Sequence, residues 1–216
     1  MQAIGLLGGS FDPIHVGHLA LARAALDSLP LARVRLLPAG QPWQKGSLSA
    51  PATDRQRMVE LAIASDARLV CDARELYRPG PTYTIDTLRE LRAELGAEMP
   101  MVLVLGADQL QRLATWRDWR ALTDFAHIAV AGRPQSSEHL PRVVEDFIAP
   151  RRAAPSAVAA APHGCVVPIA MAPVEASATE VRALLAQPPS PAADARLAQL
   201  LPAAVLDYIR AHRLYR

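Results

Sequence analysis

The chain has 216 residues, which is enough for one domain or for one domain with a small appendage. Hydrophobic residues make up 51% of it, and the net charge of +2 disfavours a broad nucleic-acid-binding surface. A signal peptide and a membrane helix are both disfavoured, because the first apolar run, 4–7, is short and the least charged stretch, 153–174, is interrupted by prolines, so we expect a soluble cytoplasmic protein.

Strand-like and helix-like segments alternate through the first half of the chain. Short apolar runs predict strands, and apolar residues spaced by three or four predict helices between them. A loop is expected to begin at Pro38, and Gly96 is expected to close a helix. The expected strands are 3–7, 34–37 and 68–71, and the expected helices are 17–29, 54–64 and 84–95.

The same alternation continues in the second half. Residues 101–105 form a continuous apolar run, which is typical of a strand in the middle of a parallel sheet. Further strands are expected at 127–131 and 166–170, and helices at 179–185 and 200–212, with 187–193 as a proline-rich linker and 135–164 as a variable excursion. The pattern predicts a doubly wound α/β fold with a mainly parallel sheet and helices on both faces. We expect a single domain, 1–216, with a small C-terminal helical part from about 175.

The turn after the first strand has the features of an anion site. Gly8 and Gly9 let the backbone turn sharply at the carboxyl end of a strand, where open α/β sheets bind ligands. A helix that starts near Gly17 points its unpaired N–H groups at the same place, and His15 and His18 can both face one phosphate. Each feature alone also fits a plainer role, since two glycines suit an ordinary turn and a histidine pair suits a surface or a cap.

Other kinds of site fit these residues less well. A zinc site around the two histidines lacks a third and fourth ligand at suitable spacing. Cys71 and Cys165 lie far apart, outside any metal-spaced cluster, and are expected to be buried thiols in a reducing compartment. Neither Gly-x-x-x-x-Gly-Lys-Ser/Thr nor Gly-x-Gly-x-x-Gly follows the first strand, which disfavours a P-loop and a dehydrogenase-type dinucleotide site.

A second polar segment, Ser-Ala-Thr-Glu-Val-Arg at 177–182, begins a late helix. Ser177 and Thr179 can offer a cap and hydroxyl groups at the helix start. Arg182, one turn further, can bind two phosphate oxygens with its guanidinium group. Taken alone, a plain N-cap with a surface arginine explains this segment more simply.

The decapeptide Gly-Ser-Phe-Asp-Pro-Ile-His-Val-Gly-His at 9–18 resembles the HxGH signature of the nucleotidyltransferase superfamily. The segment 177–182 resembles the second motif of that superfamily, with Ala178 where a further serine often stands. The resemblance implies a Rossmann-like fold and the transfer of a nucleotidyl group from a triphosphate. Phosphopantetheine adenylyltransferases share both motifs, but they are usually shorter and have Thr where His15 stands.

The chain is more similar to the bacterial nicotinate-nucleotide adenylyltransferases. The similar segments cover most of the chain in order, apart from 135–164. In that family's proline loop a histidine usually precedes the lysine, and Gln44 stands there in this chain, so the role of a side chain at this position is in doubt. The similar segments are the proline loop 37–45, the helix start 80–88, residues 105–108 followed by Trp116, and the ending 201–215.

This resemblance implies that the adenylyl group of ATP is transferred to nicotinate mononucleotide, giving deamido-NAD and pyrophosphate. Magnesium is expected to arrive with ATP, because no dedicated carboxylate cage is visible. The residues implied as catalytic are His15, His18, Lys45 and Arg182. Those implied to bind ATP are Gly8, Gly9, Ser10, Phe11, Gly17, Gly106, Asp108, Ser177 and Thr179. Those implied to bind the mononucleotide are Tyr83, Thr84, Trp116 and Arg117.

The chemistry of the residues agrees with these roles and leaves alternatives open. Trp116 can stack on the positively charged nicotinate ring, and the N–H groups at Tyr83 and Thr84 can receive its carboxylate. Trp116 also fits a core position, and Asp108 also fits a helix N-cap instead of a contact with a ribose hydroxyl or a bound metal. Transfer to nicotinamide mononucleotide or phosphopantetheine, a non-catalytic nucleotide-binding protein and nonspecific RNA binding are the rival functions, and the oligomeric state is open.

Overall fold

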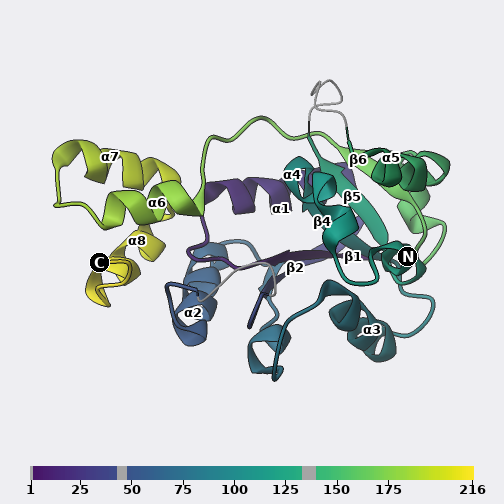
Figure 1. Cartoon of the computed structure of the whole chain (residues 1–216), viewed down its shortest axis with the longest axis horizontal. Helices are drawn as coiled ribbons and strands as arrows, with labels where there is room; N and C mark the ends of the chain where they lie inside the picture. Colours follow the sequence, from purple (N-terminus) through teal and green to yellow (C-terminus); the bar gives the residue numbers. More distant parts are fainter. Residues whose placement is uncertain (1, 43–47, 133–139) are drawn as a thin grey trace.

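The computed structural model describes residues 2–42, 48–132 and 140–216. Over these residues six parallel strands form one sheet in the order β3-β2-β1-β4-β5-β6 (Figure 1). The order reverses between β1 and β4, which is the switch point where open α/β sheets bind ligands. The predicted doubly wound α/β fold is confirmed. The strands are β1 (Ala3–Gly9), β2 (Leu31–Pro38), β3 (Leu69–Cys71), β4 (Met101–Gly106), β5 (His127–Ala131) and β6 (Val166–Ile169).

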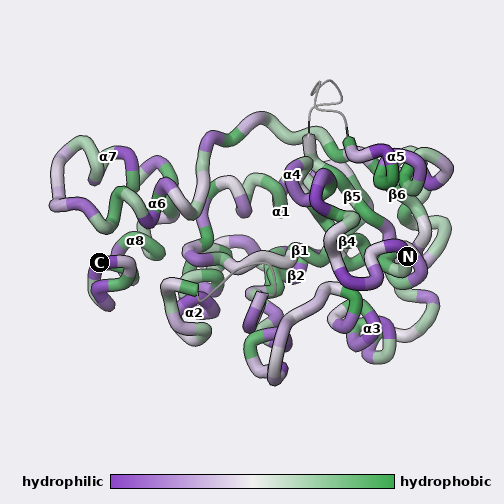
Figure 2. The backbone as a smooth tube through the Cα atoms, viewed as in Figure 1, coloured by the Kyte–Doolittle hydropathy of each residue, from purple (hydrophilic) through white to green (hydrophobic). Residues whose placement is uncertain are grey.

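Helices cover both faces of the sheet. The helices α1 (Val16–Ser28) and α2 (Ala52–Ile63) lie on one face, while α3 (Thr84–Leu95), α4 (Ala107–Gln111) and α5 (Arg142–Ile148) lie on the other. Successive side chains of β4 point to opposite faces of the sheet, so Val102 and Val104 pack with α1, whereas Leu103 and Leu105 pack with α3. Figure 2 shows the hydrophobic residues concentrated on these central strands and hydrophilic residues along the outer turns of α3 and α7.

Local sequence explains the bounds of most elements. The helix α3 spans the predicted residues 84–95, because Ile85, Leu88 and Leu91 form a buried stripe and Gly96 ends the helix at a φ of 87°. The strands β1 and β2 are longer than predicted. β1 continues through Gly8 and Gly9, which lie beside Leu37 and Pro38 of β2 in register.

Three helices after residue 177 pack against α1 and α2: α6 (Ala178–Leu185), α7 (Pro191–Leu200) and α8 (Ala203–Ala211). The prediction that 187–193 is a linker is wrong for its second part. Ser190 caps α7 by accepting a hydrogen bond from the N–H of Ala193, and Pro191 occupies the first helical turn, where its missing N–H costs nothing. The prolines thus mark a helix start as well as a connection.

The segment 135–164, predicted as a variable excursion, contains regular structure, although 135–139 lie outside the described residues. It contains α5 and two short 3₁₀ helices, η4 (Ala149–Arg151) and η5 (Pro155–Ala159). Val144, Phe147 and Ile148 of α5 are buried against the sheet. The helical pattern was missed because α5 is short and prolines follow it at once.

Both cysteines are free thiols, as predicted. They are half-buried, whereas full burial was predicted. Burial raises the pKa of the Cys71 thiol to about 12, so this group stays protonated at neutral pH. Among the described residues, every helix falls short of the length and hydrophobicity that a membrane span requires.

Candidate active site

The carboxyl ends of β1 and β4 present glycines to open space at the switch point. A Cβ atom added at Gly8 or at Gly106 would meet no other atom within 4 Å, so packing inside the chain does not require glycine at either place. Glycine there allows a bound molecule to approach the backbone closely. Gly106 is also the N-cap residue of α4, so a helix start faces the same point.

The histidine pair stands at the start of α1. His15 is the N-cap residue, and its backbone N–H donates to Nδ1 of His18 at 3.2 Å. The two imidazole rings are stacked with centroids 3.8 Å apart, and the Phe11 ring meets His18 edge-on at 4.9 Å. A Cβ atom at Gly17 would lie 3.0 Å from Nδ1 of His15, so glycine at this position lets the His15 ring lie over the helix start.

Burial sets the charge of His15. Only 8% of the residue is exposed, and burial lowers its pKa to about 4, so the imidazole is neutral at physiological pH. Its Nδ1 atom is buried and has no hydrogen-bond partner within the part of the chain that the structure describes. A buried polar atom in this state is a candidate for contact with a ligand.

Asp12 is the anchor of the turn that joins β1 to α1. The residue is 3% exposed, and its carboxylate accepts hydrogen bonds from the backbone N–H groups of Ser49 at 2.8 Å and Ala50 at 3.0 Å. It also accepts a hydrogen bond from the Tyr215 hydroxyl at 2.9 Å. Sequence reasoning missed this role, and the only signal available was that Asp12 lies inside the HxGH-like segment.

Arg55 of α2 is a second buried anchor that sequence reasoning missed. It is 1% exposed and donates to the carbonyl oxygens of Ser10 at 2.8 Å, Ala39 at 2.7 Å and Gly40 at 3.4 Å. It thereby ties the turn after β1 to the turn after β2. Burial lowers its pKa, and the nearby Asp12 carboxylate opposes that shift. The available signal was its spacing, since Arg55 shares the apolar face of its helix with Met58 and Val59.

The start of α6 meets the start of α1. Ser177 caps α6 by accepting from the Glu180 N–H at 3.1 Å, as predicted. Arg182 is half-buried and donates to the Asp12 carbonyl oxygen at 2.7 Å and to the Thr179 hydroxyl at 3.5 Å. A Cβ atom at Gly17 would lie 3.7 Å from Cβ of Ala176. The two segments 9–18 and 177–182, remote in sequence, therefore converge, and a surface arginine does not describe Arg182.

Three of the residues predicted to bind the mononucleotide, Tyr83, Thr84 and Arg117, lie together at the start of α3. Tyr83 is the N-cap residue and Thr84 is the first helical residue. The Arg117 guanidinium lies over the Tyr83 ring, 4.7 Å from its centroid, and 3.9 Å from the Asp86 carboxylate. Trp116 is half-buried at the edge of the core, and among the described residues its buried Nε1 has no acceptor.

Two further predicted residues have different outcomes. Asp108 lies exposed in the first turn of α4, whose N-cap is Gly106, so the alternative that Asp108 itself caps the helix is wrong. Lys45, with Gln44, lies outside the described residues. Gln41 and Pro42, the last described residues of the proline loop, lie just before α3 in space, because Gln41 and Thr82 exchange hydrogen bonds and Pro42 pairs with Thr82.

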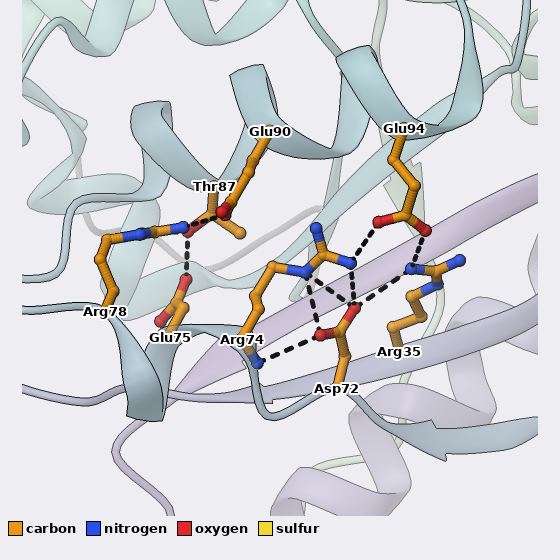
Figure 3. A network of polar contacts seen from close by, with 8 residues as sticks. All are labelled: Arg35, Asp72, Arg74, Glu75, Arg78, Thr87, Glu90 and Glu94. Atoms are coloured by element: carbon orange, nitrogen blue, oxygen red, sulfur yellow. Dashed lines mark hydrogen bonds and ion pairs between the residues drawn. The ribbon is translucent and has the colours of Figure 1, made fainter.

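A buried acid lies beneath the start of α3 (Figure 3). Glu75, on the 3₁₀ helix η1 (Arg74–Tyr77), is 6% exposed and accepts a hydrogen bond from the Thr87 hydroxyl at 2.6 Å. Burial raises the pKa of this carboxyl to about 7, although the Thr87 hydrogen bond and Arg78 oppose the shift. A Cβ atom at Gly40 would lie 2.2 Å from the Glu75 carbonyl oxygen, so the turn after β2 packs directly on η1.

Ion pairs extend this contact along α3 (Figure 3). Arg78 pairs with Glu90, and Arg74 pairs with Glu94 at 2.6 Å. Asp72 is paired with Arg74 at 2.9 Å, and burial opposes the drop in its pKa that hydrogen bonds from arginine produce. The residues 72–78 therefore hold α3 mainly through charges near the surface.

A parallel sheet whose switch point faces two converging helix starts, one with paired imidazoles and the other with an arginine, defines an α/β protein of the nucleotidyltransferase class. Residues 6–184 match the cytidylyltransferase-like family model. A relative from Herminiimonas arsenicoxydans is 42% identical over 100% of this chain and 97% of its own length, and one from Chromobacterium violaceum is 45% identical over 99% and 98%. Both are named probable nicotinate-nucleotide adenylyltransferase. The chain belongs to the cytidylyltransferase-like family and, within it, to the nicotinate-nucleotide adenylyltransferases.

Solved structures agree on the fold. The nicotinic acid mononucleotide adenylyltransferase of Plasmodium falciparum, complexed with NaAD, superposes with a TM-score of 0.74. The superposition covers 100% of this chain and 98% of the other at 17% sequence identity. The Rossmann-like arrangement is thus shared with a protein of very different sequence.

Proposed function

We propose that this chain transfers the adenylyl group of ATP to nicotinate mononucleotide, giving deamido-NAD and pyrophosphate. The observation that carries the proposal is the convergence of two helix starts, joined by the Arg182 hydrogen bond to the Asp12 carbonyl oxygen at 2.7 Å. Curated relatives at 42% and 45% identity bear the name of this activity, and the Plasmodium structure is titled as a complex with NaAD.

Adenylyl transfer requires that the two substrates be aligned and that their negative charges be neutralised. An oxygen of the mononucleotide 5′-phosphate attacks the α-phosphorus of ATP in line, and the bond to the bridging oxygen of the departing pyrophosphate breaks. Both partners are anions and no covalent intermediate is needed, so positioned donors supply most of the catalysis. Helix starts suit this task because their unpaired N–H groups and dipoles favour phosphate.

His15, His18, Lys45 and Arg182 would face the polyphosphate. The stacked imidazoles would donate hydrogen bonds as negative charge shifts to the leaving group, and the backbone N–H groups of Gly9, Ser10 and Phe11 would assist. His15 is neutral in the free protein because burial lowers its pKa to about 4. A phosphate beside the ring would favour its charged form, so ATP binding would raise that pKa.

The remaining ATP contacts would come from the strand ends and from α6. Gly8, Gly17 and Gly106 would allow close approach of the nucleotide to the backbone. Asp108, exposed at the start of α4, would accept a hydrogen bond from a ribose hydroxyl. Ser177 and Thr179 would offer hydroxyls to the phosphates at the start of α6.

The start of α3 would bind the mononucleotide. Trp116 would stack on the cationic nicotinate ring, and the first N–H groups of α3, at Tyr83 and Thr84, would receive its carboxylate. Arg117, which already lies over the Tyr83 ring, would add positive charge near that carboxylate. These features favour the acid over the amide form of the mononucleotide.

Magnesium would enter bound to ATP. In the described part of the chain, no group of three His, Cys, Asp or Glu side chains is arranged to hold a metal ion. Phosphate oxygens and water are the usual ligands of this ion at nucleotide sites, and the described residues are compatible with that arrangement. The ion would neutralise phosphate charge in the bound complex.

The test is pyrophosphate release from Mg-ATP with each of three acceptors: nicotinate mononucleotide, nicotinamide mononucleotide and phosphopantetheine. The proposal expects release with nicotinate mononucleotide at a kcat/KM at least about tenfold above that with either alternative. Preference for another acceptor would assign the chain to that reaction. ATP binding without release for any acceptor would indicate a non-catalytic nucleotide-binding protein.

A further inference from the structure

Tyr215 lies 203 residues after Asp12 in the sequence, yet its hydroxyl donates a hydrogen bond to the Asp12 carboxylate at 2.9 Å. The half-buried ring packs against the core cluster that contains α1, α2 and α8. Its backbone has a φ of 66°, a left-handed conformation that residues with side chains seldom adopt. The chain after α8 therefore turns in an uncommon way that places this hydroxyl on Asp12.

The Asp12 carboxylate is a junction between two loops of the site. One of its oxygens receives the Ser49 N–H, while the other receives the Ala50 N–H and the Tyr215 hydroxyl. Ser49 and Ala50 lie between the proline loop and α2, and Asp12 lies between β1 and the histidine pair. The buried Arg55 holds the Ser10 carbonyl oxygen at 2.8 Å on the adjoining part of the same turn.

We propose that Tyr215 is a positioning residue for adenylyl transfer, acting through the Asp12 carboxylate to fix the turn that carries His15 and His18 and the loop that leads into α2. Tyr215 itself makes no contact with the reacting atoms. The inference rests on the proposed function only in that it concerns a turnover step at this site.

The physical basis is the number of donors that the carboxylate needs. A buried carboxylate is stable when several donors surround it, and losing one leaves a lone pair unsatisfied. Burial raises the Tyr215 pKa, and the Asp12 charge raises it further, so the hydroxyl remains a donor throughout the physiological range. Without that donor the carboxylate can rotate away from the Ser49 and Ala50 N–H groups, which would loosen both loops.

The chain offers a matched control in Tyr208. Its hydroxyl donates to the Asp54 carboxylate at 2.7 Å, so it also links α8 to α2 through a tyrosine–aspartate hydrogen bond. Its ring stacks on His212. Replacing either tyrosine by phenylalanine removes one hydroxyl and keeps the ring, but only Tyr215 touches Asp12.

The experiment measures kcat and both KM values by pyrophosphate release, with thermal unfolding alongside, for Tyr215→Phe, Tyr208→Phe and the unmodified protein. We expect Tyr215→Phe to lower kcat about tenfold with KM for the mononucleotide changed less than about twofold, since small misplacements of catalytic groups act mainly on turnover. Tyr208→Phe should lower the melting temperature to a similar extent and leave kcat unchanged. An unchanged kcat in Tyr215→Phe, or equal losses of kcat in both variants, would overturn the proposal.

A double-variant cycle tests whether Tyr215 acts through Asp12. If it does, Tyr215→Phe combined with Asp12→Asn should be no slower than Asp12→Asn alone, because coupled residues are not additive. If the kcat losses of the two single variants multiply in the double variant, Tyr215 acts by another route, and the proposal is contradicted. The assay uses whichever acceptor supports turnover, so failure of this inference remains distinct from failure of the proposed substrate.

Discussion

The proposed phosphate side of the site, at the starts of α1 and α6, and the proposed mononucleotide side, at the start of α3, are held in shape by different forces. On the phosphate side, Asp12 and Arg55, 3% and 1% exposed, bind backbone groups from distant parts of the chain. On the mononucleotide side, the apolar stripe of α3 packs on the core, and its polar contacts are ion pairs such as Arg74–Glu94, in which the glutamate side chain is 45% exposed, and the buried acid Glu75. The polar contacts are therefore buried hydrogen bonds to charged groups on the phosphate side and mostly ion pairs near the surface on the mononucleotide side.

This difference predicts how each side responds to conditions. Surface ion pairs are weak and are screened by salt, whereas buried hydrogen bonds to charged groups are stronger and hardly screened. The phosphate side should therefore keep its shape over a wide range of salt and pH. The mononucleotide side should become less stable as pH rises, because the buried Glu75 carboxyl titrates near neutrality.

The largest effect is expected from Arg55→Met. The substitution leaves the carbonyl oxygens of Ser10, Ala39 and Gly40, one buried and two part-buried, without this donor and removes the cation beside Asp12, which should lower the free energy of unfolding by about 3–5 kcal/mol. Chemical denaturation measures this loss, and Arg57→Met, at an exposed position of the same helix, should change it by less than about 0.5 kcal/mol. Similar losses in both variants would remove the special role of Arg55.

The next largest effect is expected on turnover, with the fold unchanged. His18→Ala should lower kcat by about 10²–10³, because a preorganised donor at a developing charge is lost, while the fold survives. Steady-state pyrophosphate release and circular dichroism check the two parts. Turnover close to that of the unmodified protein would refute the role of His18.

The pH dependence of stability distinguishes the mononucleotide side. Glu75 has a folded pKa of about 7 against an ordinary value of 4.5, so the folded state holds a proton that the unfolded state releases between these values. The folded state therefore loses stability as pH rises from about 4.5 through 7, by an amount of order 3 kcal/mol.

The variant Glu75→Gln, which stays neutral, should not show that decline. Unfolding free energies of both proteins from pH 4 to 8 isolate the contribution, because all other groups are shared. A difference between the two proteins that stays constant across this range would contradict the assignment of a buried neutral acid.

The smallest effect is expected from Trp116→Ala. Loss of a stacking partner should raise KM for the mononucleotide by about tenfold, equivalent to about 1.4 kcal/mol, with kcat and KM for ATP little changed. Substrate-saturation curves for both substrates measure this. A KM for the mononucleotide that stays the same would place Trp116 outside the binding site.

Local sequence predicted much of the fold. The bounds of α3 and β5 followed from a helical stripe and from a short apolar run. The turn predicted at Gly8 and Gly9 comes later, because both glycines still belong to β1. The helix α7 was missed because three prolines suggested a linker, although Pro191 is well suited to a first turn. Where local signals were strong and uninterrupted, the prediction was confirmed.

The supports of the site could not be predicted in the same way. Tyr215 contacts Asp12 across 203 residues of sequence. Arg55 is buried, although arginine side chains are usually exposed. Periodicity places Arg55 on the inner face of α2, but the partners of both residues depend on which segments the sheet order brings together. The motif residues were found because they are contiguous, whereas the residues that hold them are not.

A crystal structure with a non-hydrolysable ATP analogue tests the central claim most directly. The account predicts the triphosphate between the starts of α1 and α6, within hydrogen-bonding distance of His15, His18 and Arg182. A triphosphate bound elsewhere, or these three side chains turned away from it, would contradict the account.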